Sequence, residues 1–480
     1  SSMKILHISA ECYPVAKAGG LGDVVGALPK YLCALGMSSA VILPKYALRW
    51  VKEHRFIEDY HGTIRLHDRH LPFTIEREID DTLGFPLFVA NIPDLFERDG
   101  IYASPEGYGY DDDVSRWLGF QQAVLQWVAQ FWEKPKILHC HDHHTGLIPF
   151  MVKYCPEYRA LKDLPTILTI HNGAYTGAFS WRHIDKMPLF EAHARNLLDW
   201  ADTIHPLASA IRCAWRVNTV SPGYLDELKA PDSHLNWLLN NEWHKSSGIL
   251  NGIDAQVWNP ATDPLIAHRF DGDINRFKAA NKAAICQRFR LDPELPLVTF
   301  IGRLVSEKGA DLLPGVIERA LENNAKMAFL ILGTGDPALK RAFYALRDRF
   351  FWHFDASIEY NESLAHQLYA GSDFLIMPSR IEPCGLNQLY AFRYGTIPIV
   401  RSVGGLRDTV RDWSEENPRG IRFDHFSTDD ALHALYRASL LYHDEQTLTG
   451  FRKRIMDLNF SWEKSAEAYI ALYKGVSSPL

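Results

Sequence analysis

Residues 373–409 read DFLIMPSRIEPCGLNQLYAFRYGTIPIVRSVGGLRDT. Phe374–Met377 is an apolar run without polar alternation, which is typical of a strand buried on both faces. A turn follows, and a helical run over Leu386–Tyr394 ends at Gly395. Ile397–Val400 is then a second buried strand. Strand, turn, helix and strand form the repeating unit of an open parallel sheet, so this stretch predicts an α/β fold.

The turn within this stretch carries a candidate site. In open α/β sheets ligands bind beyond the carboxyl ends of the strands, and Glu382 lies at such an end. Its carboxylate can accept a sugar hydroxyl while the helix-opening amides of Gly385 and Leu386 hold an anion. Alternatively, Glu382 only complements the helix dipole. The stretch by itself leaves both interpretations open.

Length and composition restrict the class of protein. A chain of 480 residues is too long for one core, so we expect two domains. The net charge of −7, without a basic block, argues against nucleic acid or an anionic membrane as the main partner. No apolar run approaches the ~18 residues of a membrane span. The seven cysteines are dispersed and never spaced as CxxC, which indicates a cytoplasmic protein, or a plastid stroma protein if the source is a plant.

A glycine-rich turn follows the first predicted strand, residues 3–9. Lys17, Gly19 and Gly20 stand just before a helix whose apolar stripe ends near Gly36. Such a turn can bind a phosphate or a hydroxyl-rich ligand. It matches neither the dinucleotide fingerprint nor the P-loop, so simple turn geometry is the alternative.

Residues 139–144, HCHDHH, are rich in potential metal ligands. An extended segment points alternate side chains to opposite faces, and no separate ligand cluster accompanies it, so we predict no metal here. Another buried run, Thr166–Ile170, delivers His171 at its carboxyl end. A histidine there is usually structural, but we expect His171 at the same sheet edge as Lys17 and Asp142.

The second half restarts the alternation of strands and helices. A helical, tryptophan-bearing region over 181–245 is expected before a turn-rich connection at 248–264, which marks the domain boundary. Arg303 and Lys308 follow the predicted strand Leu297–Ile301 and can hold a diphosphate from two sides. The alternative is a solvated charged loop. Tyr360 is expected to close another short strand.

Six motifs resemble bacterial glycogen synthases and plant starch synthases, which are retaining glucosyltransferases. They keep their order along the chain: KAGGL at 17–21, HDHHTG at 141–146, TIHNG at 169–173, GILNGID at 248–254, GRLVSEKG at 302–309 and SRIEPCGLNQ at 379–388. The resemblance implies two Rossmann-like doubly wound domains facing a deep cleft, the GT-B type. We predict domains at 1–247 and 248–460, and a terminal helix at 461–480 that returns to the first domain.

The resemblance also assigns roles to individual residues. Arg303 and Lys308 bind the donor diphosphate, and Lys17 with Gly19 and Gly20 approaches it from the other domain. The remaining roles are as follows: Glu382 with the amides of Cys384, Gly385 and Leu386 holds the donor glucose, His171 lies at the reacting sugar, Asp142 orients sugar or acceptor, Tyr360 stacks on the adenine, and Asn251 lies on the acceptor side. The catalytic group is then His171, Glu382, Asp142, Arg303 and Lys308, with no metal and no cofactor besides the substrate.

The implied reaction is transfer of glucose from ADP-glucose to the non-reducing end of an α-1,4-glucan with retention. UDP-glucose as donor is one alternative, and a non-catalytic glucan-binding protein is another; the presence of Lys17, Arg303, Lys308 and Glu382 counts against the latter. Tyr390 stands where many related retaining transferases have a second glutamate. Residues 225–247 lack the glycine-rich pattern usual before GILNG, which leaves acceptor handling open, as the sequence also leaves the oligomeric state.

Overall fold

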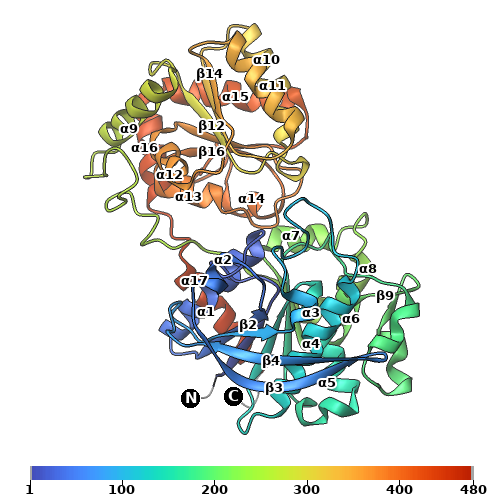
Figure 1. Ribbon diagram of the computed structural model, residues 1–480. Helices are drawn as coiled ribbons and strands as arrows, with labels where there is room; N and C mark the ends of the chain where they lie inside the picture. Colours follow the sequence, from blue (N-terminus) through green and yellow to red (C-terminus); the bar gives the residue numbers. More distant parts are fainter. Residues whose placement is uncertain (1–2, 477–480) are drawn as a thin grey trace. The chain divides into compact units, whose positions relative to one another are not determined.

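The computed structural model describes residues 3–476, and the chain forms two compact α/β units (Figure 1). Unit 1 comprises 1–220, 225–249 and 462–480, and unit 2 comprises 221–224 and 250–461. The chain therefore passes between the units near 220–225, 249–250 and 461–462. The segment 221–224 groups with unit 2, although the boundary expected from the sequence is 248.

Unit 1 is built on a nine-stranded sheet in the order β11-β10-β7-β6-β1-β2-β5-β4-β3. The strands are β1 (Ile5–Ile8), β2 (Ser39–Pro44), β3 (Phe56–Leu66), β4 (Arg69–Glu78), β5 (Leu87–Asn91), β6 (Ile137–His141), β7 (Thr166–Ile170), β10 (Arg216–Thr219) and β11 (Ser246–Gly248). The β3–β4 hairpin is antiparallel and pairs with β5, whereas the other neighbouring strands pair in parallel. The central parallel strands are buried along their whole length, which explains why their sequences are largely apolar.

Helices and short turns surround this sheet (Figure 1). The helices are α1 (Gly20–Ala34), α2 (Arg49–Lys52), α3 (Pro93–Phe96), α4 (Asp113–Ala129), α5 (Ile148–Tyr154), α6 (Pro206–Cys213), α7 (Pro222–Leu228), α8 (Asn236–Asn241) and α17 (Trp462–Lys474). α17 packs against α1, and both cover the face of the sheet that carries Ile5, Ile137 and Ile167. The last helix of the chain thus belongs to the core of unit 1.

The expectation of a helical region over 181–245 was wrong in part. This region contains α6, α7 and α8, but also β10, a small hairpin of β8 (Asp199–Trp200) and β9 (Thr203–Ile204), and several 3₁₀ turns. β10 has no apolar run because Asn218 and Thr219 occupy buried positions and are satisfied by hydrogen bonds to neighbouring strands and α17. A strand whose core positions are polar gives no hydrophobic signal in the sequence.

Unit 2 contains a fully parallel six-stranded sheet in the order β14-β13-β12-β15-β16-β17. The strands are β12 (Leu297–Ile301), β13 (Ala328–Leu332), β14 (Phe354–Ser357), β15 (Phe374–Met377), β16 (Ile397–Arg401) and β17 (Ile421–Phe423). The helices are α9 (Ile274–Phe289), α10 (Leu313–Glu322), α11 (Pro337–Arg349), α12 (Glu362–Gly371), α13 (Asn387–Arg393), α14 (Gly404–Thr409), α15 (Thr428–His443) and α16 (Glu445–Met456). β14 ends at Ser357, so Tyr360 does not close a strand, as the sequence suggested, but lies in the turn that follows.

Both sheets are doubly wound. In unit 1 the strands β2 to β5 that follow β1 are added on one side of it, and those that follow β6 are added on the other side. In unit 2 the strands are added in the same way on either side of the neighbouring pair β12 and β15. At such a switch point the connections leave on opposite sides of the sheet, which opens a crevice beyond the carboxyl ends of the two strands. The predicted α/β class with two doubly wound domains is confirmed. Within residues 3–476, no helix has the length and apolarity to cross a bilayer.

Candidate functional site

The Glu11 carboxylate accepts hydrogen bonds from the backbone of the glycine-rich turn in unit 1. α1 begins at Gly20, and Gly19 precedes it in extended conformation. Oε1 of the buried Glu11 accepts hydrogen bonds from the amides of Ala18 (2.6 Å) and Gly19 (3.0 Å), and the hydroxyl of Tyr102 donates to Oε2. Burial is the main reason why the pKa of Glu11 is raised. Glu11 therefore fixes the turn.

Lys17 stands at the outer side of this turn. Its ammonium pairs with the Asp23 carboxylate at 2.8 Å, and its side chain is 41% exposed. Because both partners keep solvent access, the lysine can exchange this partner for an anionic ligand at low cost. The sequence does not indicate this role of Glu11, because a single glutamate after a strand forms no recognisable motif.

Asp142 follows β6 and anchors the residue after β7. Its Oδ1 accepts the amide hydrogen of His171 at 2.7 Å and that of Asn172 at 3.5 Å. Asp142 has φ +60° and ψ −173°, an unfavourable conformation for a residue with a Cβ, and such strain is concentrated at functional sites. Burial raises the pKa of Asp142 to about 7, against the two amide hydrogen bonds, which lower it. The structure thus joins Asp142 and His171, as expected.

The imidazole of His171 is the end of a buried row of histidines. Nε2 of His171 lies 2.9 Å from Nδ1 of His141, and Nε2 of His141 lies 2.9 Å from Nδ1 of His7. Burial lowers the pKa of His7 and of His171 to about 3, and it lowers that of His141 as well, so the row is neutral near pH 7. His7 and His141 lie on the neighbouring strands β1 and β6. No pattern in the sequence indicates that their side chains face each other.

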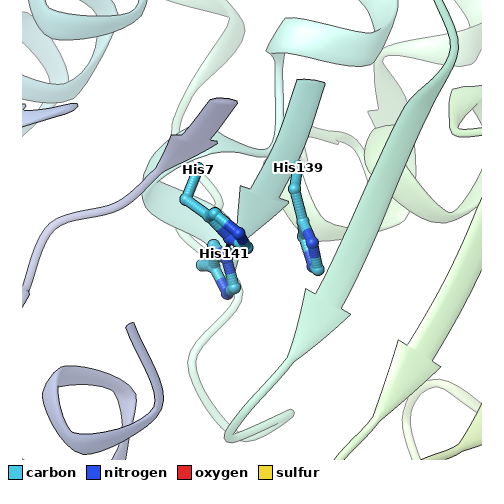
Figure 2. A group of neighbouring side chains, drawn as sticks. All are labelled: His7, His139 and His141. Atoms are coloured by element: carbon cyan, nitrogen blue, oxygen red, sulfur yellow. Dashed lines mark hydrogen bonds between the residues drawn. The ribbon is translucent and has the colours of Figure 1, made fainter. Parts of the chain in front are cut away.

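His7, His139 and His141 form the one group in residues 3–476 whose ligand atoms lie close enough together to suggest a metal, within 4.8 Å (Figure 2). His139 lies in register with His7, and its nitrogens pair with the hydroxyls of Tyr473 (2.8 Å) and Thr169 (2.6 Å). The His139 and His141 rings stack with their centroids 4.3 Å apart and 10° between their planes, so their nitrogen lone pairs lie in nearly parallel planes. Both nitrogens of His139, Nδ1 of His7 and Nε2 of His141 thus already take part in hydrogen bonds.

In unit 2 the turns after β12 and β15 meet. The Arg380 amide donates to the Glu307 carbonyl at 2.9 Å. Gly309 has φ +70°, and a Cβ there would lie 1.9 Å from the Pro378 carbonyl oxygen, so only glycine permits this approach. The approach brings the Lys308 ammonium to 2.9 and 3.0 Å from the two oxygens of Glu382.

Glu382 is held by a second donor as well. The Ser379 hydroxyl donates to its Oε2 at 3.0 Å, and only 4% of Glu382 is exposed, whereas 30% of the Lys308 side chain is. A buried carboxylate fixed by two donors is suited to accept a hydroxyl hydrogen in a defined direction. Arg303 is exposed in the same turn as Lys308, and Tyr360 is 83% exposed after β14, so both are available to a ligand.

The loop from Cys384 to Leu386 lies against Gly405, near the start of α14. The Gly405 amide donates to the Glu382 carbonyl at 3.1 Å, and a Cβ on Gly405 would lie 2.1 Å from the Cys384 carbonyl oxygen. α13 begins at Asn387, directly after Leu386. The backbone N–H of Asn251 lies near the buried Cys384 thiol, so Asn251, expected on the acceptor side, borders this loop.

Comparison with known proteins assigns the family. A family model described as "Starch synthase catalytic domain" matches residues 4–241, and one described as "Glycosyl transferases group 1" matches 281–449. A glycogen synthase of Flavobacterium johnsoniae is 45% identical over 98% of both chains. One from Streptococcus gordonii is 36% identical over 99% of this chain and 100% of its own.

This chain belongs to the glycogen and starch synthase family. The solved catalytic domain of starch synthase IV from Arabidopsis thaliana, bound to ADP and acarbose, superimposes with a TM-score of 0.86 at 33% identity, with both chains fully covered. Sucrose-phosphate synthase from Thermosynechococcus elongatus, at a TM-score of 0.61 and 17% identity, shares the fold. As a glycogen/starch synthase family member, the protein is a glucosyltransferase with the GT-B fold, and its predicted site residues form two sets, one on each unit.

Proposed function

We propose that the protein transfers glucose from ADP-glucose to the non-reducing 4-hydroxyl of an α-1,4-glucan, with retention of configuration. The observation that carries this proposal is the Lys308–Glu382 pair at the β12/β15 switch point, where a cation for a diphosphate stands beside an acceptor for a sugar hydroxyl. The starch synthase IV domain, a relative along the whole chain, was solved with ADP and acarbose, which supports an adenine nucleotide and a glucan as ligands.

The roles of the unit 2 residues follow from their chemistry. The guanidinium of Arg303 and the ammonium of Lys308 neutralise the diphosphate, and the exposed ring of Tyr360 stacks on the adenine. Glu382 accepts a hydroxyl of the glucose, while the amides of the loop at 384–386 contact the same sugar. Cationic side chains that offset the charge of the leaving group make a metal unnecessary in this scheme.

Further roles belong to residues of unit 1. Lys17 and the turn at Gly19 and Gly20 approach the diphosphate, His171 lies at the reacting sugar, and Asp142 holds the His171 backbone. The bond between the anomeric carbon and the phosphate oxygen breaks, and the glucan 4-hydroxyl oxygen bonds to the same face of that carbon. The hydroxyl proton leaves with the departing phosphate oxygen, so no protein nucleophile is needed. Asn251 contacts the acceptor glucan.

The test offers ADP-glucose and UDP-glucose separately to the protein with a malto-oligosaccharide, and measures nucleotide release and product length. Chain extension with a kcat/KM at least tenfold higher for ADP-glucose supports the proposal. Preference for UDP-glucose identifies the other donor, and binding of glucan without transfer from either donor contradicts an enzymatic role. Activity that survives exhaustive chelation supports the metal-free scheme, whereas zinc lost together with activity refutes it. A cytoplasmic location remains our expectation, supported by seven free thiols among the described residues.

A further inference from the structure

The row His7–His141–His171 restricts where its protons can lie. Each neutral imidazole carries one N–H, and each of the two N···N contacts at 2.9 Å needs one hydrogen. If His141 carries its hydrogen on Nε2, then His7 must carry its own on Nε2 and His171 must donate from Nε2. If His141 carries it on Nδ1, then all three carry it on Nδ1. These two arrangements are the only ones that keep both bonds, so the three tautomers change together.

The far end of the row decides between the two arrangements. Nε2 of His7 is buried and has no hydrogen-bond partner. The first arrangement places an N–H at this nitrogen, whereas the second leaves only a lone pair there. Buried N–H groups without a partner are rarer in proteins than acceptors left unsatisfied. The second arrangement is therefore favoured, in which every histidine of the row donates from Nδ1.

His139 is kept out of the row by its own partners. The Thr169 hydroxyl donates to Oδ1 of Asn218, whose Nδ2 donates to the Tyr469 hydroxyl. The hydroxyl of Thr169 must then accept from Nε2 of His139, and Nδ1 of His139 accepts from Tyr473. His139 thus takes the opposite tautomer. A metal ion between His7, His139 and His141 would have to break several of these bonds.

In the favoured arrangement, Nε2 of His171 accepts from His141 and Nδ1 of His171 carries the hydrogen. This Nδ1 has no protein partner among residues 3–476 and is the nitrogen left for a ligand. We propose that His141 and His7 are positioning residues that lock His171 as a hydrogen-bond donor through Nδ1 to a hydroxyl of the transferred sugar. This inference rests on the proposed function for the sugar, but the tautomer itself does not depend on it.

The first test reads the tautomers directly. ¹⁵N NMR spectra of the full chain, labelled only at the histidine rings, distinguish protonated from unprotonated nitrogens at pH 7 without substrate. Signals of the row are assigned by their loss in single substitutions at 7, 141 and 171. We expect uncharged rings protonated at Nδ1 for all three and at Nε2 for His139. Protonation of His171 at Nε2, a charged row, or stoichiometric zinc with unprotonated His7 and His141 would overturn the proposal.

The second test separates positioning from mere packing. His141→Asn can place an amide N–H near the original Nδ1 and donate to His171, whereas His141→Leu cannot. In His141→Leu we expect kcat to fall about 10- to 100-fold below that of the unsubstituted protein. In His141→Asn the loss of kcat should be about ten times smaller. The KM for the donor should stay within about threefold of the unsubstituted value in both variants. The His171 signal should remain protonated at Nδ1 in His141→Asn and become a mixture of tautomers in His141→Leu.

If His141→Leu and His141→Asn both fold and have equal kcat values, the positioning role is contradicted. An unchanged His171 tautomer in His141→Leu would contradict it as well. If His141→Leu does not fold, the spectrum of the unsubstituted protein decides by itself. Because that spectrum needs no substrate, a failure of the ADP-glucose assay and a failure of the tautomer assignment are distinguished.

Discussion

Arg303 and Lys308 follow the same strand, but their surroundings differ. Lys308 contacts the buried Glu382, whereas Arg303 is exposed. If both bind the donor diphosphate, replacing either by alanine removes a charge-assisted contact of about 2–4 kcal/mol, which is about 30- to 1,000-fold in kcat/KM. Steady-state kinetics of Arg303→Ala and Lys308→Ala test this, with the exposed Arg341→Ala and Lys326→Ala of the same unit as controls. Wild-type kinetics in both site variants would refute the assignment.

Asp142 should make unit 1 less stable as the pH rises. Its pKa is about 7 in the folded protein against an ordinary 3.8, because burial disfavours the carboxylate. Between these values the unfolded chain has lost a proton that the folded chain keeps. The stabilising contribution is therefore complete below about pH 4 and is lost towards pH 7, with a slope of up to about 1.4 kcal/mol per pH unit.

Urea unfolding of Asp142→Asn between pH 4 and 8 tests this slope. The asparagine oxygen can still accept the His171 amide hydrogen, but it does not titrate. The difference in free energy of unfolding between the protein and this variant should shift in favour of the variant as the pH rises, while the exposed Asp163→Asn should show no such trend. A parallel pH dependence of protein and Asp142→Asn would show that Asp142 stays ionised.

The packing of α14 on the loop at 382–384 depends on a missing side chain. A Cβ on Gly405 would lie 2.1 Å from the Cys384 carbonyl oxygen, a backbone atom that cannot rotate away. Gly405→Ala should therefore displace the loop, lower kcat/KM by about tenfold or more and cost about 1–3 kcal/mol of stability. In Gly450→Ala, on α16, the added methyl meets nothing within 4 Å, and we expect unchanged kinetics and stability equal or slightly higher.

Activity assays and thermal unfolding of both variants decide this prediction. Full activity and an unchanged Tm in Gly405→Ala would mean that the loop tolerates the methyl group and that α14 does not position it.

The predicted site residues lie on separate units, and neither set by itself can surround a sugar nucleotide. Lys17, Asp142 and His171 belong to unit 1, and Arg303 and Glu382 belong to unit 2. We expect donor and glucan together to bring the units into a closed arrangement, with the bending confined to the points where the chain passes between the units, near 220–225, 249–250 and 461–462. Closure also excludes water, which would otherwise hydrolyse the donor.

Small-angle scattering measures this motion. The radius of gyration should decrease with a non-hydrolysable ADP-glucose analogue plus oligosaccharide, and Arg303→Ala should show no decrease at the same concentrations. An unchanged radius in the unsubstituted protein would refute closure and leave the deep cleft expected from the family without support.

The sequence by itself determined the elements whose burial is uniform. Thr166–Ile170, Leu297–Ile301 and Phe374–Met377 were predicted with the bounds observed, because a parallel strand covered on both faces needs a continuous apolar run. The six ordered motifs likewise determined the family. β10 was missed because its buried positions are polar.

Only the tertiary structure decided which polar groups meet. His7 and His141 are 134 positions apart, and the Glu11 carboxylate reaches amides seven and eight residues away through a folded turn. Lys308 meets Glu382 because Gly309 lets two turns touch. Alternation along a strand gives the face on which a side chain lies, but its partner depends on strand order and register. Strand order and register are set by packing over the whole sheet, so a local sequence pattern does not predict them.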